Sequence, residues 1–238
     1  MTAVSLCRTL AMMVSAVVLA PAAMAQWSGK GQAGAVLASG NSAAKSGSVK
    51  LGIVDTVEAW THKLDVAAIY ASDEGGSTAQ RWELHEQSNY EFDAHNFVFG
   101  GLRYENDRFS GFNHQGTVGA GIGHQFLETA ATTLSGQLGV AYKVAEEGDP
   151  AVQVKSLAST GSADFRHAFS ASTTVLDKIT LEHTSRNTFV ENEVALEVKM
   201  NAKLALAVAF AVRHNTDPPP TFKATDTLTT VNVVYEIK

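Results

Sequence analysis

The chain has 238 residues, of which 45% are hydrophobic and 18% are charged, with a formal net charge of −6 and a single cysteine. The acidic balance argues against a nucleic-acid-binding protein, for which a basic face is expected. One cysteine excludes a disulfide framework and a cysteine-based zinc cluster, and outside residues 10–20 no apolar run approaches the ~18 residues of a membrane-spanning helix.

The first 25 residues have the pattern of a secretory signal peptide. A positive residue precedes a short apolar segment, 10–20, and Ala23-Met24-Ala25 is an A-x-A cleavage pattern. We therefore predict cleavage between Ala25 and Gln26, which leaves 26–238 as one mature domain. The alternative, an uncleaved anchor helix, fits poorly with so short an apolar segment.

From Trp27 onward the hydrophobic pattern has a period of two. In 204–212, for example, every second residue is a large apolar one and the residues between are alanines. Alternate residues of a strand face opposite sides of a sheet, so each such segment has one apolar face and one polar or small face. Strands are predicted at 27–38, 47–56, 61–71, 81–92, 96–106, 115–127, 132–144, 154–168, 173–183, 188–199, 203–213 and 226–237.

The connections between these segments alternate in length. Short turns follow the even-numbered strands, whereas longer polar loops, such as 72–80 and 214–225, follow most odd-numbered ones. This alternation is typical of an up-and-down barrel with both termini in the periplasm, and most segments reach the ~9–11 residues that a tilted strand needs to cross a membrane. The predicted fold is therefore an all-β, antiparallel, up-and-down transmembrane β-barrel of about 12 strands.

Aromatic residues gather near both ends of the predicted strands, as expected for the two headgroup levels of a membrane. The predicted short-turn belt contains Trp27, Trp60, Phe92, Phe97, Phe126, Phe169 and Tyr235, and the predicted long-loop belt contains Tyr70, Trp82, Tyr104, Tyr142 and Phe189. A soluble periplasmic barrel that binds a ligand remains the alternative, because a period of two does not show which face is outside.

Three landmarks along the mature chain resemble a known family. They are Trp27-Ser28-Gly29 with 38–42, the run 102–112 (LRYENDRFSGF) with 119–123, and 212–216 with 225–228. They are similar to a domain-of-unknown-function family of outer-membrane β-barrels described as salt-induced outer membrane proteins. The resemblance covers essentially the whole mature chain and implies location in the outer membrane of a Gram-negative cell. It implies no catalytic residues.

A group of charged residues is predicted to face the lumen as a possible constriction: Arg103, Glu105, Asp107, Arg108 and Arg213. Rings of charged side chains can select solutes in a pore. The alternative is structural, with the same charges pairing to fold the third long loop inward. Gly119, Gly121 and Gly123 lie on one face of a strand, where they would make room for a bulky loop or let the strand bend.

His183 and Ser185 form the one candidate for covalent catalysis. Two residues apart on a strand, they face the same side, and a histidine can activate a serine as nucleophile if an acid such as Glu191 or Glu193 orients it. The alternative is a hydrogen-bonded loop entrance. We assign no catalytic, cofactor-binding or metal-binding residue.

The expected protein is thus a non-enzymatic, porin-like outer-membrane barrel with a role in envelope maintenance or in passive solute passage through a narrow lumen. A lipid-modifying hydrolase using His183 and Ser185, and a soluble ligand-binding barrel, are the alternatives. The expected partners are outer-membrane lipid and lipopolysaccharide, the barrel-assembly machinery and small solutes, with no nucleic acid.

Overall fold

The computed structural model describes residues 26–39, 45–73, 76–107, 112–147, 152–218 and 222–237. The predicted signal peptide, 1–25, lies outside the described residues, and Gln26 is the first residue of β1. The strands are β1 (Gln26–Ser39), β2 (Lys45–Val57), β3 (Trp60–Asp73), β4 (Gly76–Glu91), β5 (Asn96–Asp107), β6 (Phe112–Glu128), β7 (Thr132–Glu147), β8 (Val152–Ala168), β9 (Thr173–Thr184), β10 (Thr188–Lys199), β11 (Leu204–Asn215) and β12 (Thr225–Ile237). Within these ranges no helix is long and apolar enough to span a bilayer.

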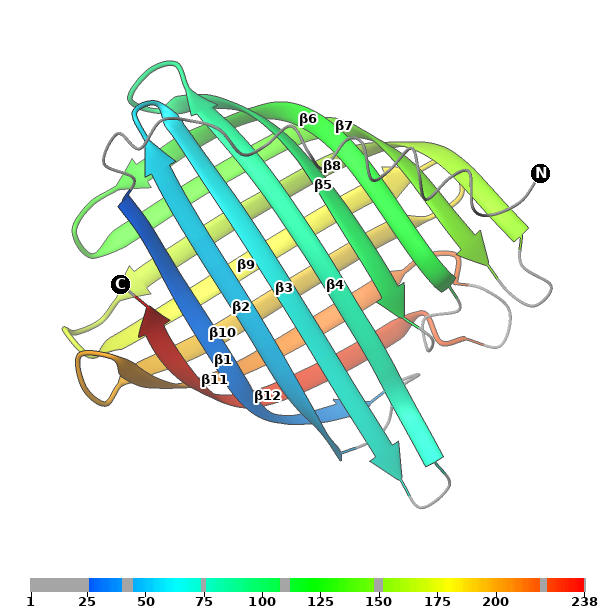
Figure 1. Ribbon diagram of the computed structural model, residues 1–238. Coiled ribbons are helices and arrows are strands. Elements are labelled where there is room, and N and C mark those ends of the chain that lie inside the picture. Colours follow the sequence, from blue (N-terminus) through cyan, green and yellow to red (C-terminus); the bar gives the residue numbers. More distant parts are fainter. Residues whose placement is uncertain are drawn as a thin grey trace.

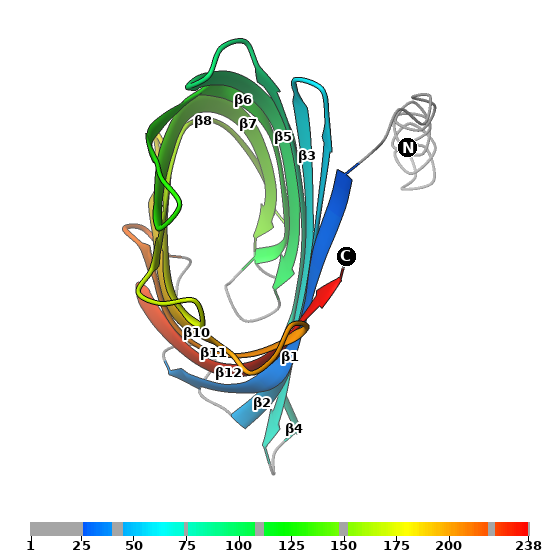
Figure 2. The same cartoon turned by 90° about the vertical axis from the view of Figure 1, so that its left-hand side faces the viewer.

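Each strand pairs antiparallel with its neighbours in the sequence, and β1 pairs with β12 to close the barrel (Figure 1). Closure leaves no unpaired strand edge, which a bilayer requires because it offers no water to unpaired backbone groups. Seen from its end, the barrel has an oval cross-section (Figure 2). The predicted transmembrane β-barrel is confirmed, and each predicted segment coincides with one observed strand apart from its ends.

The strands extend further than their hydrophobic pattern predicts. β3 continues to Asp73 and β4 begins at Gly76, so most of the predicted loop 72–80 belongs to a hairpin. Residues 76–80 are glycine, serine, threonine, alanine and glutamine, so they show no apolar alternation although their backbone pairs. We call the end of the barrel with the β2–β3 turn the short-turn end, and the end with the β11–β12 connection the long-loop end.

The apolar face of the sheet points outward. Leu138 and Leu157 are 69% and 77% exposed, whereas Glu105 and Glu197, on the other face, are 2% and 5% exposed. This is the inverse of a soluble barrel, whose apolar face would fill the interior. The arrangement gives lipid an apolar wall and leaves the polar groups to pair inside the lumen.

The inward face of β11 consists of small residues. Ala205, Ala207, Ala209 and Ala211 are all buried, and Val234 of β12 is buried beside them. Small side chains leave the space above these strands to long polar side chains that reach across from other parts of the wall.

Eight of the twelve predicted belt residues face outward from strands, Phe92 and Phe169 are exposed in turns, and two were predicted wrongly. Phe97 and Phe189 point into the lumen: a Cβ added at inward-facing Gly123 would lie 2.0 Å from Phe97 Cζ, and Phe189 is 8% exposed and lines the lumen cavity. Gly121 and Gly123 of β6 therefore accommodate the rings of Phe99 and Phe97, rather than the predicted loop or bend, whereas Gly119 lies against Ala141 and Val140 of β7. Both phenylalanines lie near strand ends, so position in the sequence suggested a belt although their parity places them inside.

Candidate functional site: a charged network across the lumen

The lumen holds a cavity of about 250 Å³ whose lining comes from β2 to β10. Most of its lining side chains are polar or charged, because alternate residues of every strand project inward. The ionisable ones are Lys50, Asp65, Glu83, His85, Arg103, Lys178, Glu182, Glu191 and Glu193. A mixed-charge lining holds water and ions better than an apolar solute.

Two arginines and two glutamates form a compact group on β4 and β5. Glu83 and Glu105 lie directly opposite each other across the two strands, which on its own is repulsive. Arg81 lies 2.7 Å from Glu83 and 3.6 Å from Glu105. Arg103 lies 3.2 Å from Glu83 and also contacts Glu105. Each guanidinium thus lies between both carboxylates, and its attraction to them offsets the repulsion between Glu83 and Glu105.

Arg213 reaches this group from the opposite wall. It lies on β11, six strands from β5 in the closed order, yet its guanidinium is 3.4 Å from Glu105 and 3.9 Å from Asp107. Its Nε is also 3.2 Å from Glu191 Oε2, close enough for an ion pair although the angle does not make a hydrogen bond. The ring of Phe189 lies 5.2 Å from the same guanidinium. Arg213 therefore ties the two walls together across the lumen.

These seven residues, Arg81, Glu83, Arg103, Glu105, Asp107, Glu191 and Arg213, are called the lumen network here. Three arginines face four carboxylates, so the network carries one excess negative charge when all are ionised. Its members need one another because a charge removed from water is costly unless it is paired. The register of β5 against β6 shifts between Glu105 and Asp107, two members of the network.

Polar side chains span the lumen at two further places. Gln87 of β4 and Gln137 of β7 exchange amide hydrogen bonds of 3.1 and 3.2 Å. Nearer the short-turn end, Lys30 of β1 lies 3.0 Å from Glu197 of β10. The strands passed over by these side chains carry small inward residues, such as Gly119 and Ala207, which leave them room.

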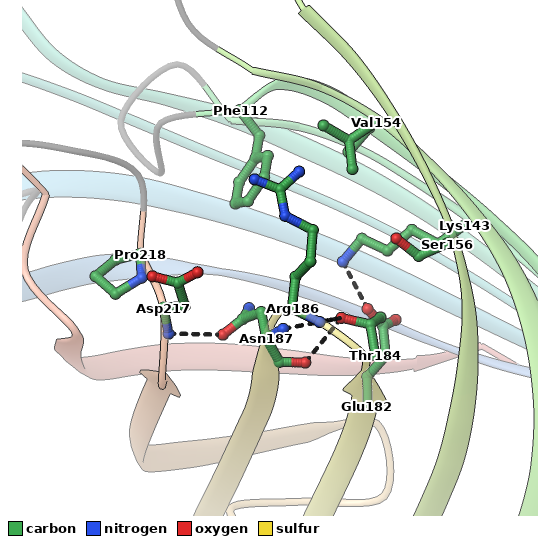
Figure 3. A pocket seen from close by; sticks show the side chains of 11 residues that line it. Phe112, Lys143, Val154, Ser156, Glu182, Thr184, Arg186, Asn187, Asp217 and Pro218 are labelled. Atoms are coloured by element: carbon green, nitrogen blue, oxygen red, sulfur yellow. Dashed lines mark hydrogen bonds and ion pairs between the residues drawn. The ribbon is translucent and has the colours of Figure 1, made fainter.

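A second cavity, of about 320 Å³, lies at the long-loop end (Figure 3). Lys143 and Glu182 form an ion pair on its wall, and the Asp217 backbone N–H donates to Asn187 Oδ1 at 3.0 Å. Arg186 projects into this cavity beside Phe112. The cavity forms a vestibule on the same side of the barrel as the lumen network.

The structure brings four of the five predicted constriction residues together: Arg103, Glu105, Asp107 and Arg213. Arg108 lies outside the described residues. Sequence reasoning missed Arg81 altogether and considered Glu191 only as a partner of His183. The signal for both was parity, because Arg81 is two residues before Glu83 and Glu191 is two residues before Glu193.

The family profile described as "Protein of unknown function, DUF481" matches residues 31–237. The chain belongs to the DUF481 family. This agrees with the expected domain-of-unknown-function family, whereas the salt-induced description stays a prediction. The DUF481 chain is 23% identical over 181 residues to the uncharacterized protein YdiY of Escherichia coli (strain K12), covering 75% of this chain and 70% of YdiY.

Two solved structures show the same fold as the DUF481 barrel. The NanC porin superposes with a TM-score of 0.61 at 9% identity, covering 87% of this chain and 100% of the porin. The translocator domain of the autotransporter NalP from Neisseria meningitidis superposes with a TM-score of 0.55 at 12% identity, covering 88% of each chain. At these identities the likeness concerns the fold.

The candidate nucleophile of the DUF481 barrel is not assembled. His183 faces outward, where its Nδ1 lies 2.8 Å from Thr188 Oγ1. Glu191 and Glu193 line the lumen cavity on the other face of the sheet, so neither can orient the His183 ring. Within the described ranges, no group of three or more histidine, cysteine, aspartate or glutamate residues could hold a metal ion.

Proposed function

We propose that this DUF481 protein is a non-enzymatic outer-membrane channel that passes small ions and polar solutes, with both termini in the periplasm. The lumen network is its constriction. The observation that carries the proposal is Arg213, which reaches across the lumen from β11 to Glu105 and Asp107 of β5 and so narrows a polar lumen. The fold shared with the NanC porin supports it.

The alternatives have less support. A hydrolase using His183 and Ser185 lacks an acid on the correct face of β10. A soluble periplasmic barrel would have to expose its apolar wall to water. A purely structural role in the envelope differs from a channel in one measurable respect, which is the absence of conductance.

Conductance in planar bilayers tests the proposal. The purified full chain should give small, discrete current steps. Arg213→Ala should give larger steps with a stronger preference for cations, since it opens the tie and leaves the four carboxylates in excess. Arg166→Ala is the matched control, because Arg166 lies on β8 outside the lumen network.

The possible outcomes separate the two parts of the proposal. No current in either the natural protein or Arg213→Ala at any voltage would overturn the channel function. Equal conductance and selectivity in the natural protein and Arg213→Ala would instead overturn the role of the lumen network as the constriction.

A further inference from the structure

A row of four side chains crosses the outer wall near the short-turn end. Trp27, Asp55, His62 and Ser88 lie directly opposite one another on β1, β2, β3 and β4. They face outward, because they share the parity of exposed residues such as Val49 on β2. We call this set the outer row. It places the Asp55 carboxylate next to the exposed Trp27 on the outer wall.

Asp55 is not satisfied by the protein. Its Oδ1 is buried and has no hydrogen-bond partner, and within the described ranges no cation forms an ion pair with it. A covered carboxylate oxygen without a donor costs free energy. Asp177 on β9 makes the contrast clear: it also faces outward, yet Asn192 Nδ2 donates to its Oδ1 at 2.6 Å. A neighbouring side chain on the outer wall therefore donates a hydrogen bond to Asp177, whereas Asp55 Oδ1 has no such donor.

The surroundings of Asp55 suit a cationic group. Trp27 and Trp60 are 53% and 44% exposed, and Trp60 stacks on His62 with ring centroids 5.9 Å apart and lies 5.0 Å from Tyr90. Aromatic faces attract ammonium groups. A second outward carboxylate, Glu86, adds negative charge on β4, two strands from Asp55.

The polar groups beside Asp55 are already engaged and leave it free. Ser88 Oγ donates to Glu86 Oε1 at 2.6 Å, so it accepts from His62 Nδ1 at 2.7 Å. These two hydrogen bonds hold the His62 ring in place. They also use the Ser88 hydroxyl hydrogen, so Ser88 cannot donate to Asp55. Because Oδ1 is covered by the protein, a donor from outside the outer row would meet the carboxylate at its other oxygen, Oδ2.

The level of the outer row identifies the source of that donor. Exposed tryptophan and tyrosine rings at a strand end mark the headgroup region of a bilayer, where the cations within reach belong to lipids. Indole N–H groups at the same level can donate to a phosphate. The site thus offers a carboxylate for an ammonium group and indole donors for the phosphate next to it.

We propose that the outer row, with Trp60, binds the headgroup of a zwitterionic phospholipid that carries a primary ammonium group. The ammonium lies at Asp55 between Trp27 and Trp60, and the phosphate accepts from the indoles. The site is on the lipid-facing wall, so it does not depend on the proposed channel.

Quenching of tryptophan fluorescence by bromine-labelled lipids tests the site. The full chain with Trp82→Phe keeps Trp27 and Trp60 as reporters and is reconstituted in phosphatidylcholine vesicles. Bromine-labelled phosphatidylethanolamine should quench at about 3- to 5-fold lower mole fraction than bromine-labelled phosphatidylglycerol, as expected for one exposed ion pair with aromatic support. Asp55→Asn in the same background should abolish the preference, and Asp177→Asn should retain it.

Three results would overturn the proposal. They are equal quenching by the two lipids in the Trp82→Phe protein, an unchanged preference in Asp55→Asn, and quenching by bromine-labelled phosphatidylcholine as strong as by phosphatidylethanolamine. The last result matters because a quaternary ammonium cannot donate a hydrogen bond to Asp55. If Asp55→Asn does not fold, the comparison of lipids in the Trp82→Phe protein still decides.

Discussion

Glu105 is the residue on which the lumen network converges. It is 2% exposed and lies within ion-pair distance of arginines from three strands, Arg81, Arg103 and Arg213. A carboxylate so completely removed from water is tolerated only with such partners. The arginines depend on it in turn, because Glu105 is the one carboxylate of the lumen network that contacts all three of them.

Replacing Glu105 by glutamine should therefore destabilise the barrel. We expect the free energy of unfolding to fall by about 3 kcal/mol, the usual cost of removing one partner of a buried ion pair. Urea titration of unfolding from lipid vesicles measures it. Asp164→Asn is the control: Asp164 is paired with Lys178 at 4.0 Å with both side chains half exposed, and its loss should cost less than about 1 kcal/mol. Equal losses in the two variants would contradict the central role of Glu105.

Asp93, in the turn between β4 and β5, is a second residue with a defined electrostatic role. It accepts hydrogen bonds from the Asn96 side chain and from the backbone N–H groups of His95 and Asn96, and these donors lower the pKa of its carboxyl below the ordinary value. A lowered pKa in the folded state means that the contribution to stability is present above the pKa of the unfolded state. It is lost as the pH falls through the folded-state pKa.

Asn96→Ala should raise the pKa of Asp93 toward its ordinary value, because the largest contribution comes from the Asn96 side chain. Carbon-detected NMR titration of the carboxyl group in detergent micelles measures it. Asn201→Ala changes a similar turn, in which Asn201 Oδ1 accepts from the backbone of Lys203 and Leu204, and should leave the Asp93 titration unchanged. Identical titration curves in Asn96→Ala and the natural protein would show that the side-chain bond has no effect.

At the scale of elements, β5 and β6 are fitted together by aromatic rings on glycines. Phe97 lies over Gly123, and Phe99 lies 2.7 Å from where a Cβ at Gly121 would be. Gly123→Ala should destabilise the barrel by about 1–3 kcal/mol, the usual cost of overpacking. Unfolding in urea, followed by far-UV circular dichroism, measures the loss.

A double-mutant cycle identifies the cause. Phe97→Ala removes the ring that the new methyl group would meet, so Gly123→Ala should cost far less in that background. An equal cost in both backgrounds would mean that the glycine is needed for its backbone and not for the space it leaves.

The elements could be predicted from sequence wherever one face is apolar, as in 204–212, because the alternation reports the contrast between lipid and lumen. The alternation could not place the start of β4, since residues 76–80 show no such contrast. It grouped Arg103 and Glu105 correctly because they are two residues apart. The approach of Arg213 to Glu105 depends on barrel closure and on an oval section, which a local pattern does not contain.

For the whole molecule, the oval section explains how a twelve-stranded barrel has a narrow lumen. In a round barrel the width grows with the number of strands, and eight already leave an interior that side chains fill. Flattening brings β5 and β11 close enough for a glutamate and an arginine to meet (Figure 2). The lumen network and the oval cross-section therefore stabilise each other. The ion pairs of Arg213 hold the two walls together, and the short distance between the walls lets those ion pairs form.

The proposed orientation can be tested on intact cells, since it determines which side of the membrane the lumen network faces. With both termini in the periplasm, the turn at Glu58 is periplasmic and the turn at Arg186 is external, and both residues are exposed. The sole natural cysteine is Cys7, within the predicted signal peptide. A membrane-impermeant maleimide should therefore label an Arg186→Cys variant in intact cells, and a Glu58→Cys variant only after the outer membrane is permeabilised.

The lipid-facing Leu157→Cys variant is the control and should remain unlabelled in both conditions, because its side chain lies in the apolar wall. Labelling of Glu58→Cys but not Arg186→Cys in intact cells would reverse the orientation. The vestibule beside Arg186 and the lumen network would then open to the periplasm, and solutes from outside would meet the Lys30–Glu197 tie first.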